Sequence, residues 1–143
     1  MPPETKPVPV VLAVTITQFR TLGGVFPTSA TYAVTSAPPG VKIIGGNIII
    51  RASQPVNVVF QLSSAAYVFV GACFAAPGIP GDVGISEYPA IHINRSRPGN
   101  SLTITDLNLP ENKGKPYNYI LFVQEIESGD IGMIDPIMIN DGD

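Results

Sequence analysis

The sequence has few of the residues on which most catalytic and metal chemistry depends. Its 143 residues include one cysteine, one histidine and no tryptophan, and only 13% of them are charged. The single cysteine, Cys73, cannot form an internal disulfide, and with one histidine it cannot supply the four ligands of a standard zinc site. The fold therefore does not depend on an oxidising compartment, and we expect a cytoplasmic protein without a cofactor.

Long hydrophobic runs and helical periodicity are absent as well. No segment approaches the roughly 18 to 20 apolar residues that a membrane helix needs, so we expect no association with a membrane. The stretch VPVVLAVTI, residues 8–16, has the composition of a signal-peptide core. Its leader, however, carries one acid against one base, and no small-residue cleavage site follows, so we predict a strand there.

Positive charge is sparse and scattered, and the acids gather in the last quarter of the chain. Up to residue 105 there are six bases and three acids, whereas from Asp106 onward eight acids stand against Lys113 and Lys115. An acidic end without a basic cluster disfavours nucleic acid as a partner. The oppositely charged halves could pack together or meet head to tail between copies. Because so few residues are charged, part of the surface must be neutral or apolar, and we predict a homo-oligomer.

What the sequence does contain is a repeated alternation of apolar and polar residues. Fifteen prolines and fourteen glycines interrupt almost every helix-length window, whereas period-two patterns recur and predict short strands. The first places Val10, Leu12, Val14 and Ile16 on one face of residues 8–19. Further strands are predicted within 30–35, on both sides of Gly45-Gly46, and at 56–63, 66–74, 90–95, 101–106, 117–126, 130–135 and 136–140.

Eight or nine short strands joined by Gly/Pro turns predict one domain, residues 1–143, with an all-β fold. We expect an antiparallel Greek-key β-sandwich of immunoglobulin-like type. Residues 66–74 are apolar on both faces, which is typical of a central strand. The β-branched run NIIIR, residues 47–51, is predicted to be an exposed edge through which the protein interacts.

Several segments resemble a family of small bacterial proteins called DP-EP. The segments are QPVNVVFQLSSAAYVFVGACFAAP at 54–77, SLTITDLN at 101–108, YNYILFV at 117–123 and IDPIMIND at 134–141. Their order is similar to that of the family, and the likeness covers most of the chain from about residue 8 to 140. The resemblance implies a β-sandwich and no established activity, so it supports the predicted fold and adds little about function.

The residues needed for catalysis do not cluster. His92 alternates with two isoleucines and is expected to project outward, and its neighbours Ser86 and Glu87 lie roughly 20 Å away along an extended chain. No serine lies in a G-x-S-x-G motif. Cys73 occupies the most apolar predicted strand without a base nearby, where a thiol behaves as a small hydrophobe. We therefore predict no catalytic residue and a protein that is not an enzyme.

The acidic C-terminal segments are the best candidates for a ligand. Asp135, Asp141 and Asp143 supply the hard oxygens that calcium prefers, but the chain ends without a bidentate glutamate. The structural alternative is that EIESGD, residues 125–130, forms a polar hairpin turn and that Asp135-Pro136 breaks a strand. The predicted function is structural or interaction-based, through self-association or sheet surfaces. The alternative is a small binding module for calcium or a neutral ligand.

Overall fold

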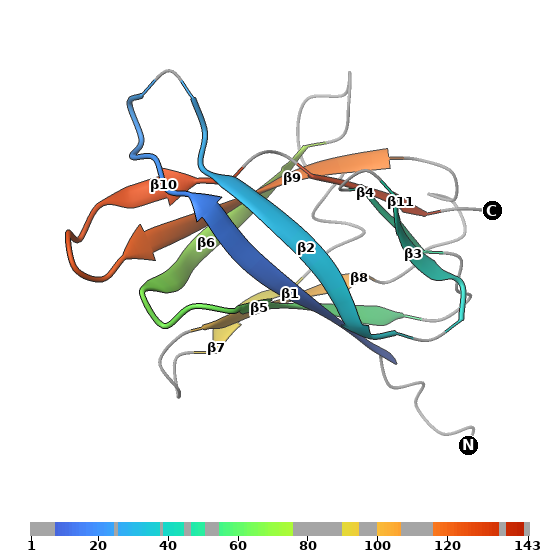
Figure 1. The fold of residues 1–143 in the computed structure, drawn as a ribbon. Helices are drawn as coiled ribbons and strands as arrows, with labels where there is room; N and C mark the ends of the chain where they lie inside the picture. The colour runs from blue at the N-terminus through green and yellow to red at the C-terminus, as the bar shows by residue number, and fades with distance from the viewer. Residues whose placement is uncertain are drawn as a thin grey trace.

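Strands make up all of the regular structure in the part of the chain that this computed structural model describes (Figure 1), which is residues 8–24, 26–37, 39–44, 47–50, 55–75, 90–94, 100–106, 116–134 and 137–141. The strands are β1 (Val8–Gln18), β2 (Ser29–Ser36), β3 (Val41–Ile44), β4 (Asn47–Ile50), β5 (Val56–Leu62), β6 (Tyr67–Ala75), β7 (Ala90–Asn94), β8 (Ser101–Asp106), β9 (Pro116–Glu125), β10 (Ile131–Met133) and β11 (Ile137–Asp141). These eleven exceed the eight or nine expected, because the two runs around Gly45-Gly46 form separate strands, β3 and β4, and the two closing segments form β10 and β11. Nowhere in the described residues is there a helix of the length and apolarity that crossing a membrane requires.

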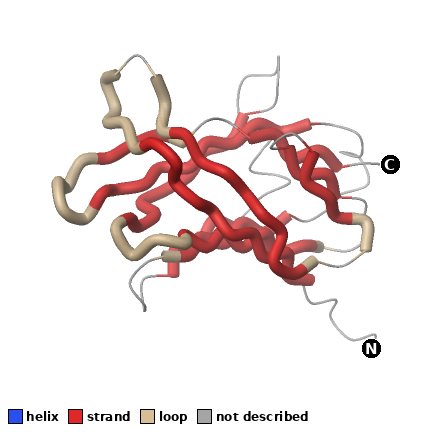
Figure 2. The backbone as a smooth tube through the Cα atoms, in the orientation of Figure 1, coloured by secondary structure: helices blue, strands red, loops and turns tan. Residues whose placement is uncertain are grey.

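The strands form two sheets. The five-stranded sheet has the order β2-β1-β5-β8-β7. In the six-stranded sheet, β9 pairs with β6, and also with β10 and β11, after which β4 and β3 follow. One layer lies in front of the other in Figure 1, with β1 and β2 crossing in front of β6 and β9, and Figure 2 shows the same two layers of strands. The expected all-β structure is confirmed, and its layers correspond to those of a β-sandwich.

Side chains from both sheets bury one core, as the alternating pattern predicts. Val10, Leu12 and Val14 of β1 are fully buried, while the residues between them are at least partly exposed. Burying every second residue is what a strand with one face on the core does. The rest of the core comes from both layers and consists of Ile48, Ile50, Val56, Val58, Phe60, Leu62, Phe69, Leu102, Ile104, Leu121, Val123 and Ile134. The Tyr32 ring meets that of Phe60 edge-on, with centroids 6.3 Å apart.

The expectation of purely antiparallel pairing is wrong. β1 pairs with β5 in parallel over seven residue pairs, from Val8 opposite Val56 to Val14 opposite Leu62. β11 and β4 are also parallel. Two parallel neighbours need a crossover connection between them. Between β1 and β5 the chain forms β2 and then passes through the other sheet as β3 and β4. Alternation shows which face of a strand is buried, but it carries no information about the direction of its neighbour.

Two predicted strand positions are exchanged in the structure. NIIIR is not an exposed edge, because β4 lies between β3 and β11, and Ile48 and Ile50 are at most 1% exposed. β6 is not central, since among the described strands it pairs with β9 alone. Both segments are apolar runs of β-forming residues, and such runs do not reveal how many neighbours a strand has.

The closing part of the chain follows β9 along one side as two strands, β10 and β11, as expected from its two apolar segments. Met133 of β10 lies opposite Phe122, and Ile137 of β11 lies opposite Tyr119, so the register shifts by one residue between them. A one-residue shift is the mark of a bulge, and a bulge is one of the few places in a sheet where proline is tolerated. The predicted strand break is therefore confirmed by the flanking strands, although Asp135 and Pro136 themselves lie outside the described residues.

Candidate functional site

The connection between β1 and β2 reaches across to the other sheet. The backbone N–H of Leu22 donates to the carbonyl oxygen of Ile131, and that of Thr28 donates to the carbonyl oxygen of Met133, both at 2.8 Å. These bonds occupy the outer edge of β10, which pairs on its other side with β9. Thr28 also forms an isolated parallel bridge with Ile134. Residues 19–28, which we call the β1–β2 loop, thus link the two layers at this end of the molecule.

The two ends of this loop, which we call its neck, are held together by one buried hydroxyl group. Thr28 is fully buried, and its Oγ1 accepts a hydrogen bond from the Arg20 N–H and donates one to the Arg20 carbonyl oxygen, each at 2.8 Å. Gly132 of β10 packs directly against this pair. A Cβ atom there would stand 2.5 Å from Thr28 Oγ1 and 2.6 Å from the Arg20 carbonyl oxygen. Only glycine fits so close to the neck without a shift of the backbone.

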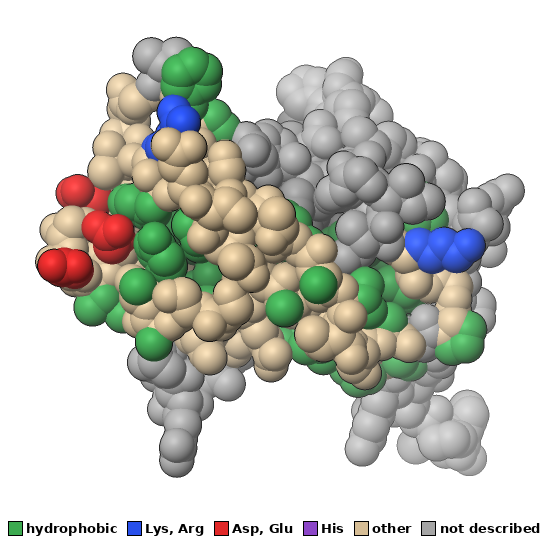
Figure 3. All heavy atoms as spheres, viewed as in Figure 1, with side chains coloured by type: hydrophobic (Ala, Val, Ile, Leu, Met, Phe, Trp, Pro, Cys, Tyr) green, Lys and Arg blue, Asp and Glu red, His purple; other side chains and the backbone are tan. Residues whose placement is uncertain are grey.

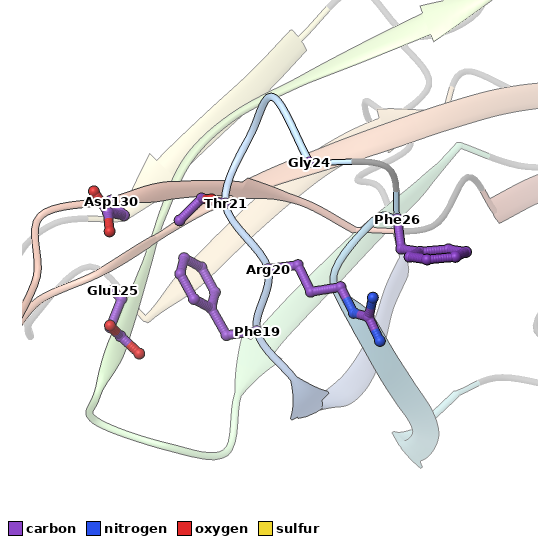
Figure 4. A pocket seen from close by; sticks show the side chains of 7 residues that line it. All are labelled: Phe19, Arg20, Thr21, Gly24, Phe26, Glu125 and Asp130. Carbon is purple, nitrogen blue, oxygen red and sulfur yellow. The ribbon is translucent and has the colours of Figure 1, made fainter.

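A hollow of about 480 Å³ lies between the β1–β2 loop and the turn that joins β9 to β10. Its lining residues are Phe19, Arg20, Thr21, Gly24, Phe26, Glu125 and Asp130 (Figure 4). In that view the Arg20 side chain points away from the two carboxylates and toward Phe26. The Arg20 guanidinium carbon is 4.9 Å from the centroid of the Phe26 ring, a cation–π contact. On the other wall, the Phe19 ring lies 5.5 Å from that of Tyr67.

The two carboxylates of the hollow have no counter-ion among the described residues. Glu125 and Asp130 form no ion pair with any residue of the chain that the structure describes. Their positions are fixed by the backbone, because the Glu125 N–H donates to the Asp130 carbonyl oxygen at 2.9 Å. Gln124 Nε2 adds a bond of 2.8 Å to the Gly129 carbonyl oxygen. The predicted polar hairpin turn is confirmed, and it holds both acids on a rigid element beside an aromatic wall.

A second surface stands out for its lack of charge. The described side chains on the outer face of the five-stranded sheet are Pro9, Val11, Ala13, Thr15, Thr31, Ala33, Thr35, Asn57, Val59, Gln61, Ser101, Thr103 and Thr105, which alternate with the core residues of their strands. In Figure 3 the region over β1 and β2 shows no charged side chain, whereas acids and bases gather at the ends of the molecule.

Several polar groups of this neutral face bond to one another. Thr105 Oγ1 donates to Asn57 Oδ1 at 2.8 Å, joining β8 to β5. Thr15 Oγ1 and Ser63 Oγ lie 3.0 Å apart, and Thr35 Oγ1 donates to the Val11 carbonyl oxygen at 3.1 Å. A group that already has a protein partner loses less when water is removed from it. The free-energy cost of removing water from this face is therefore lower than its number of threonines suggests.

The site residues predicted from the sequence do not form a described cluster. Asp135 and Asp143 lie outside the described residues, and Asp141 is the last residue of β11, with its side chain outside them. His92 lies in β7 opposite Thr103, and Cys73 lies in β6 opposite Ile120; the side chains of both are also outside the described set. Within the residues searched, no three histidine, cysteine, aspartate or glutamate side chains come close enough to hold a metal ion.

No model of a known protein family matches the chain, and no curated protein sequence matches it either. The resemblance to the DP-EP family therefore stays a prediction. Sequence reasoning missed Phe19, Arg20, Phe26 and Thr28, which shape the loop and the hollow. The one local signal was Gly23-Gly24, which marks a turn, and Gly23 has a positive φ of 94°. Nothing in the sequence connects this turn with Glu125, about a hundred residues further along.

Proposed function

We propose that this protein is a non-enzymatic interaction protein that self-associates through its five-stranded sheet. The observation that carries the proposal is the absence of charge from the described outer face of that sheet. Charged side chains are the groups that proteins deplete at the centre of an interface, because they lose the most when water is removed. Two copies that meet through a neutral sheet also avoid the repulsion that like charges would cause.

The low overall charge supports the same proposal. With 13% of residues charged, the chain has about half of the roughly 25% found in a typical soluble domain. The charged side chains that the structure describes lie off the outer face of this sheet: Arg20 belongs to the β1–β2 loop, Glu125, Glu127 and Asp130 lie at the β9–β10 turn, and Lys42 belongs to β3. The neutral part of the surface thus lies over β1 and β2, on the outer face of the five-stranded sheet, where a second copy could make contact.

Sedimentation over a range of protein and salt concentrations tests this function. A contact between neutral surfaces should keep nearly the same dissociation constant from low to high salt, because there is little charge to screen. A head-to-tail contact between oppositely charged halves should instead weaken as salt rises. A protein that is monomeric at 100 µM, a protein concentration chosen to reveal weak association, would refute self-association.

Amide hydrogen exchange locates the contact. Peptides that cover β2, and also β1 and β5 if the sheet faces meet, should exchange more slowly at high protein concentration than at low concentration, because association removes amides from solvent. The peptide that covers residues 124–131, at the β9–β10 turn, is the internal control and should not change. Protection confined to that turn would place the contact on the charged end and refute the role of the sheet.

We also propose that the two layers are connected as an immunoglobulin-like Greek key. Supporting this, the chain leaves one sheet for the other after β2, after β4, after β5, after β6 and after β8. Such repeated exchange between layers is typical of Greek-key sandwiches. Carbon and nitrogen chemical shifts with inter-strand nuclear Overhauser contacts would test the connectivity, including the segments outside the described residues.

A second candidate function is ligand binding in the hollow. The observation that favours it is a pair of carboxylates that have no counter-ion among the described residues and lie beside the Phe19 ring, a combination that suits an organic ammonium group. Titration with tetramethylammonium should shift the amide resonances of residues 19–21 and 125–130. Glu125→Gln should weaken the effect, whereas Glu127→Gln, on the same turn but away from the lining, should not. Equal loss in both variants would reject a specific site.

A further inference from the structure

We infer that two copies of this chain pair along β2, antiparallel and around a two-fold axis, so that two five-stranded sheets become one sheet of ten strands. This inference rests on the proposed self-association and names the part of the sheet that makes the contact. A strand at the edge of a sheet presents unpaired N–H and C=O groups, which a second strand can satisfy. A symmetric dimer uses the same patch on both subunits, and an edge strand meets that condition.

β2 has the properties of an unprotected edge. It is the terminal strand of its sheet and pairs only with β1 among the described strands. Its eight residues, SATYAVTS, contain no charged residue and no proline, and at about 3.3 Å per residue they span roughly 26 Å. Thr31, Ala33, Val34, Thr35 and Ser36 are all exposed. Val34, a large apolar side chain, is 42% exposed.

The other edges with described side chains each carry a feature that limits pairing. The outer edge of β10 is covered, because Leu22 and Thr28 donate hydrogen bonds to it. Lys42 is exposed on β3, and a lysine on an edge strand discourages a neighbour. β6 is bulged at Val70, and no described side chain of it is exposed. Among these described edges, β2 alone combines length, exposure and neutrality.

Part of β2 is regular enough to serve as a template. The β1–β2 pair has irregularities at its two ends, but the register is continuous from Leu12 opposite Val34 to Ile16 opposite Ala30. An axis at Ala33 places the small Ala33 side chains of the two copies opposite each other. It also places Tyr32 of each copy opposite Val34 of the other, and pairs of an aromatic with a β-branched residue stabilise antiparallel strands.

Single-cysteine cross-linking distinguishes edge pairing from contact between sheet faces. Ala33→Cys and Ala13→Cys are each made together with Cys73→Ser, so that every chain holds one thiol. Ala13 lies opposite Ala33 on β1 and on the same face, which makes it a matched control. In the edge-paired dimer the two thiols introduced at position 33 face each other within disulfide range, whereas those introduced at position 13 are three strand spacings, roughly 14 Å, apart.

Mild oxidation should therefore cross-link Ala33→Cys in high yield and leave Ala13→Cys as monomers under denaturing electrophoresis. Far-ultraviolet dichroism checks that both variants are folded. If Cys73→Ser does not fold, peptide mapping of Ala33→Cys with Cys73 retained gives the same readout. Cross-linking of Ala13→Cys in place of Ala33→Cys would show a face-to-face dimer, which overturns this inference but keeps the proposed function. A chain that stays monomeric overturns both.

Charged substitutions at Ala33 test the edge-paired dimer independently of cross-linking. Ala33→Lys places two like charges opposite each other at the axis and should raise the dimer dissociation constant by about tenfold or more at low salt. Ala33→Glu should have a similar effect, and an equimolar mixture of the two variants should recover dimers with one copy of each. Thr15→Lys, on β1, should leave the dissociation constant unchanged within about twofold. An Ala33→Lys protein that dimerises like the unchanged protein would refute edge pairing.

Discussion

Replacing Gly132 by alanine tests how tightly the β1–β2 loop is packed on β10. The added Cβ would stand 2.5 Å from Thr28 Oγ1, 2.6 Å from the Arg20 carbonyl oxygen and 2.9 Å from Phe19 Cε2. All three distances are below the range of real carbon contacts, and one of the three atoms belongs to the backbone. The new methyl group cannot be accommodated by rotating one flexible side chain, so the loop or β10 must move.

The magnitude follows from these contacts. Overpacking of a close-fitting site costs about 1–3 kcal/mol, and we expect the upper part of that range because the displaced atoms also hold the neck hydrogen bonds. At roughly 2–4 °C of melting temperature per kcal/mol for a chain of this size, the melting temperature should fall by about 4–12 °C. Urea unfolding followed by far-ultraviolet dichroism measures the same change as a free energy.

The matched control is Gly71→Ala in β6. A Cβ at Gly71 meets nothing within 4 Å, so this variant gains about 0.4–1 kcal/mol from the smaller entropy of its unfolded chain. The same chemical change should therefore destabilise at one position and stabilise at the other. A Gly132→Ala protein whose unfolding free energy stays within about 0.5 kcal/mol of the unchanged protein would show that the neck is not closely packed.

Three further predictions concern the neck, the core and metal binding. Thr28→Val leaves the backbone N–H and C=O of Arg20 without their hydroxyl partner and should cost about 1–3 kcal/mol in urea unfolding, while Thr28→Ser should cost less. Phe60→Ala should cost about 3–5 kcal/mol because the ring is fully buried, whereas Phe26→Ala, at a ring that is 62% exposed, should cost under about 1 kcal/mol. Calcium should leave the melting temperature unchanged; a rise that Asp141→Asn abolishes would establish a metal site instead.

Alternation predicted the faces of the strands well and their neighbours poorly. Val10, Leu12 and Val14 were placed on one face from spacing alone, and that face is the core. The same spacing cannot tell whether β1 lies beside a parallel or an antiparallel strand, because a side chain points inward in either case. The pairing of β1 with β5 depends on how the intervening strands pack in the other sheet, which is a property of the whole chain.

The hollow was beyond sequence reasoning for a similar reason. Glu125 and Asp130 were recognised as a polar turn, and that turn is present. Their neighbours in space, Phe19 and Arg20, are more than a hundred residues earlier and belong to no motif. Local chemistry predicts a turn from Glu125 to Asp130, but only the packing of two sheets brings an aromatic ring beside it. The composition, in contrast, predicted a surface of low charge, although it could not place the neutral part on the five-stranded sheet.

The parallel pairing of β1 with β5 has a consequence for synthesis of the chain. β1 leaves the ribosome before β5, which is one of its two neighbours in the sheet. β5 is complete only when Leu62 has been made. Until then β1 presents an open row of amide groups on that side. Folding of such long-range pairs is slow, and aggregation during synthesis is therefore a greater risk for the earliest strands than for the last.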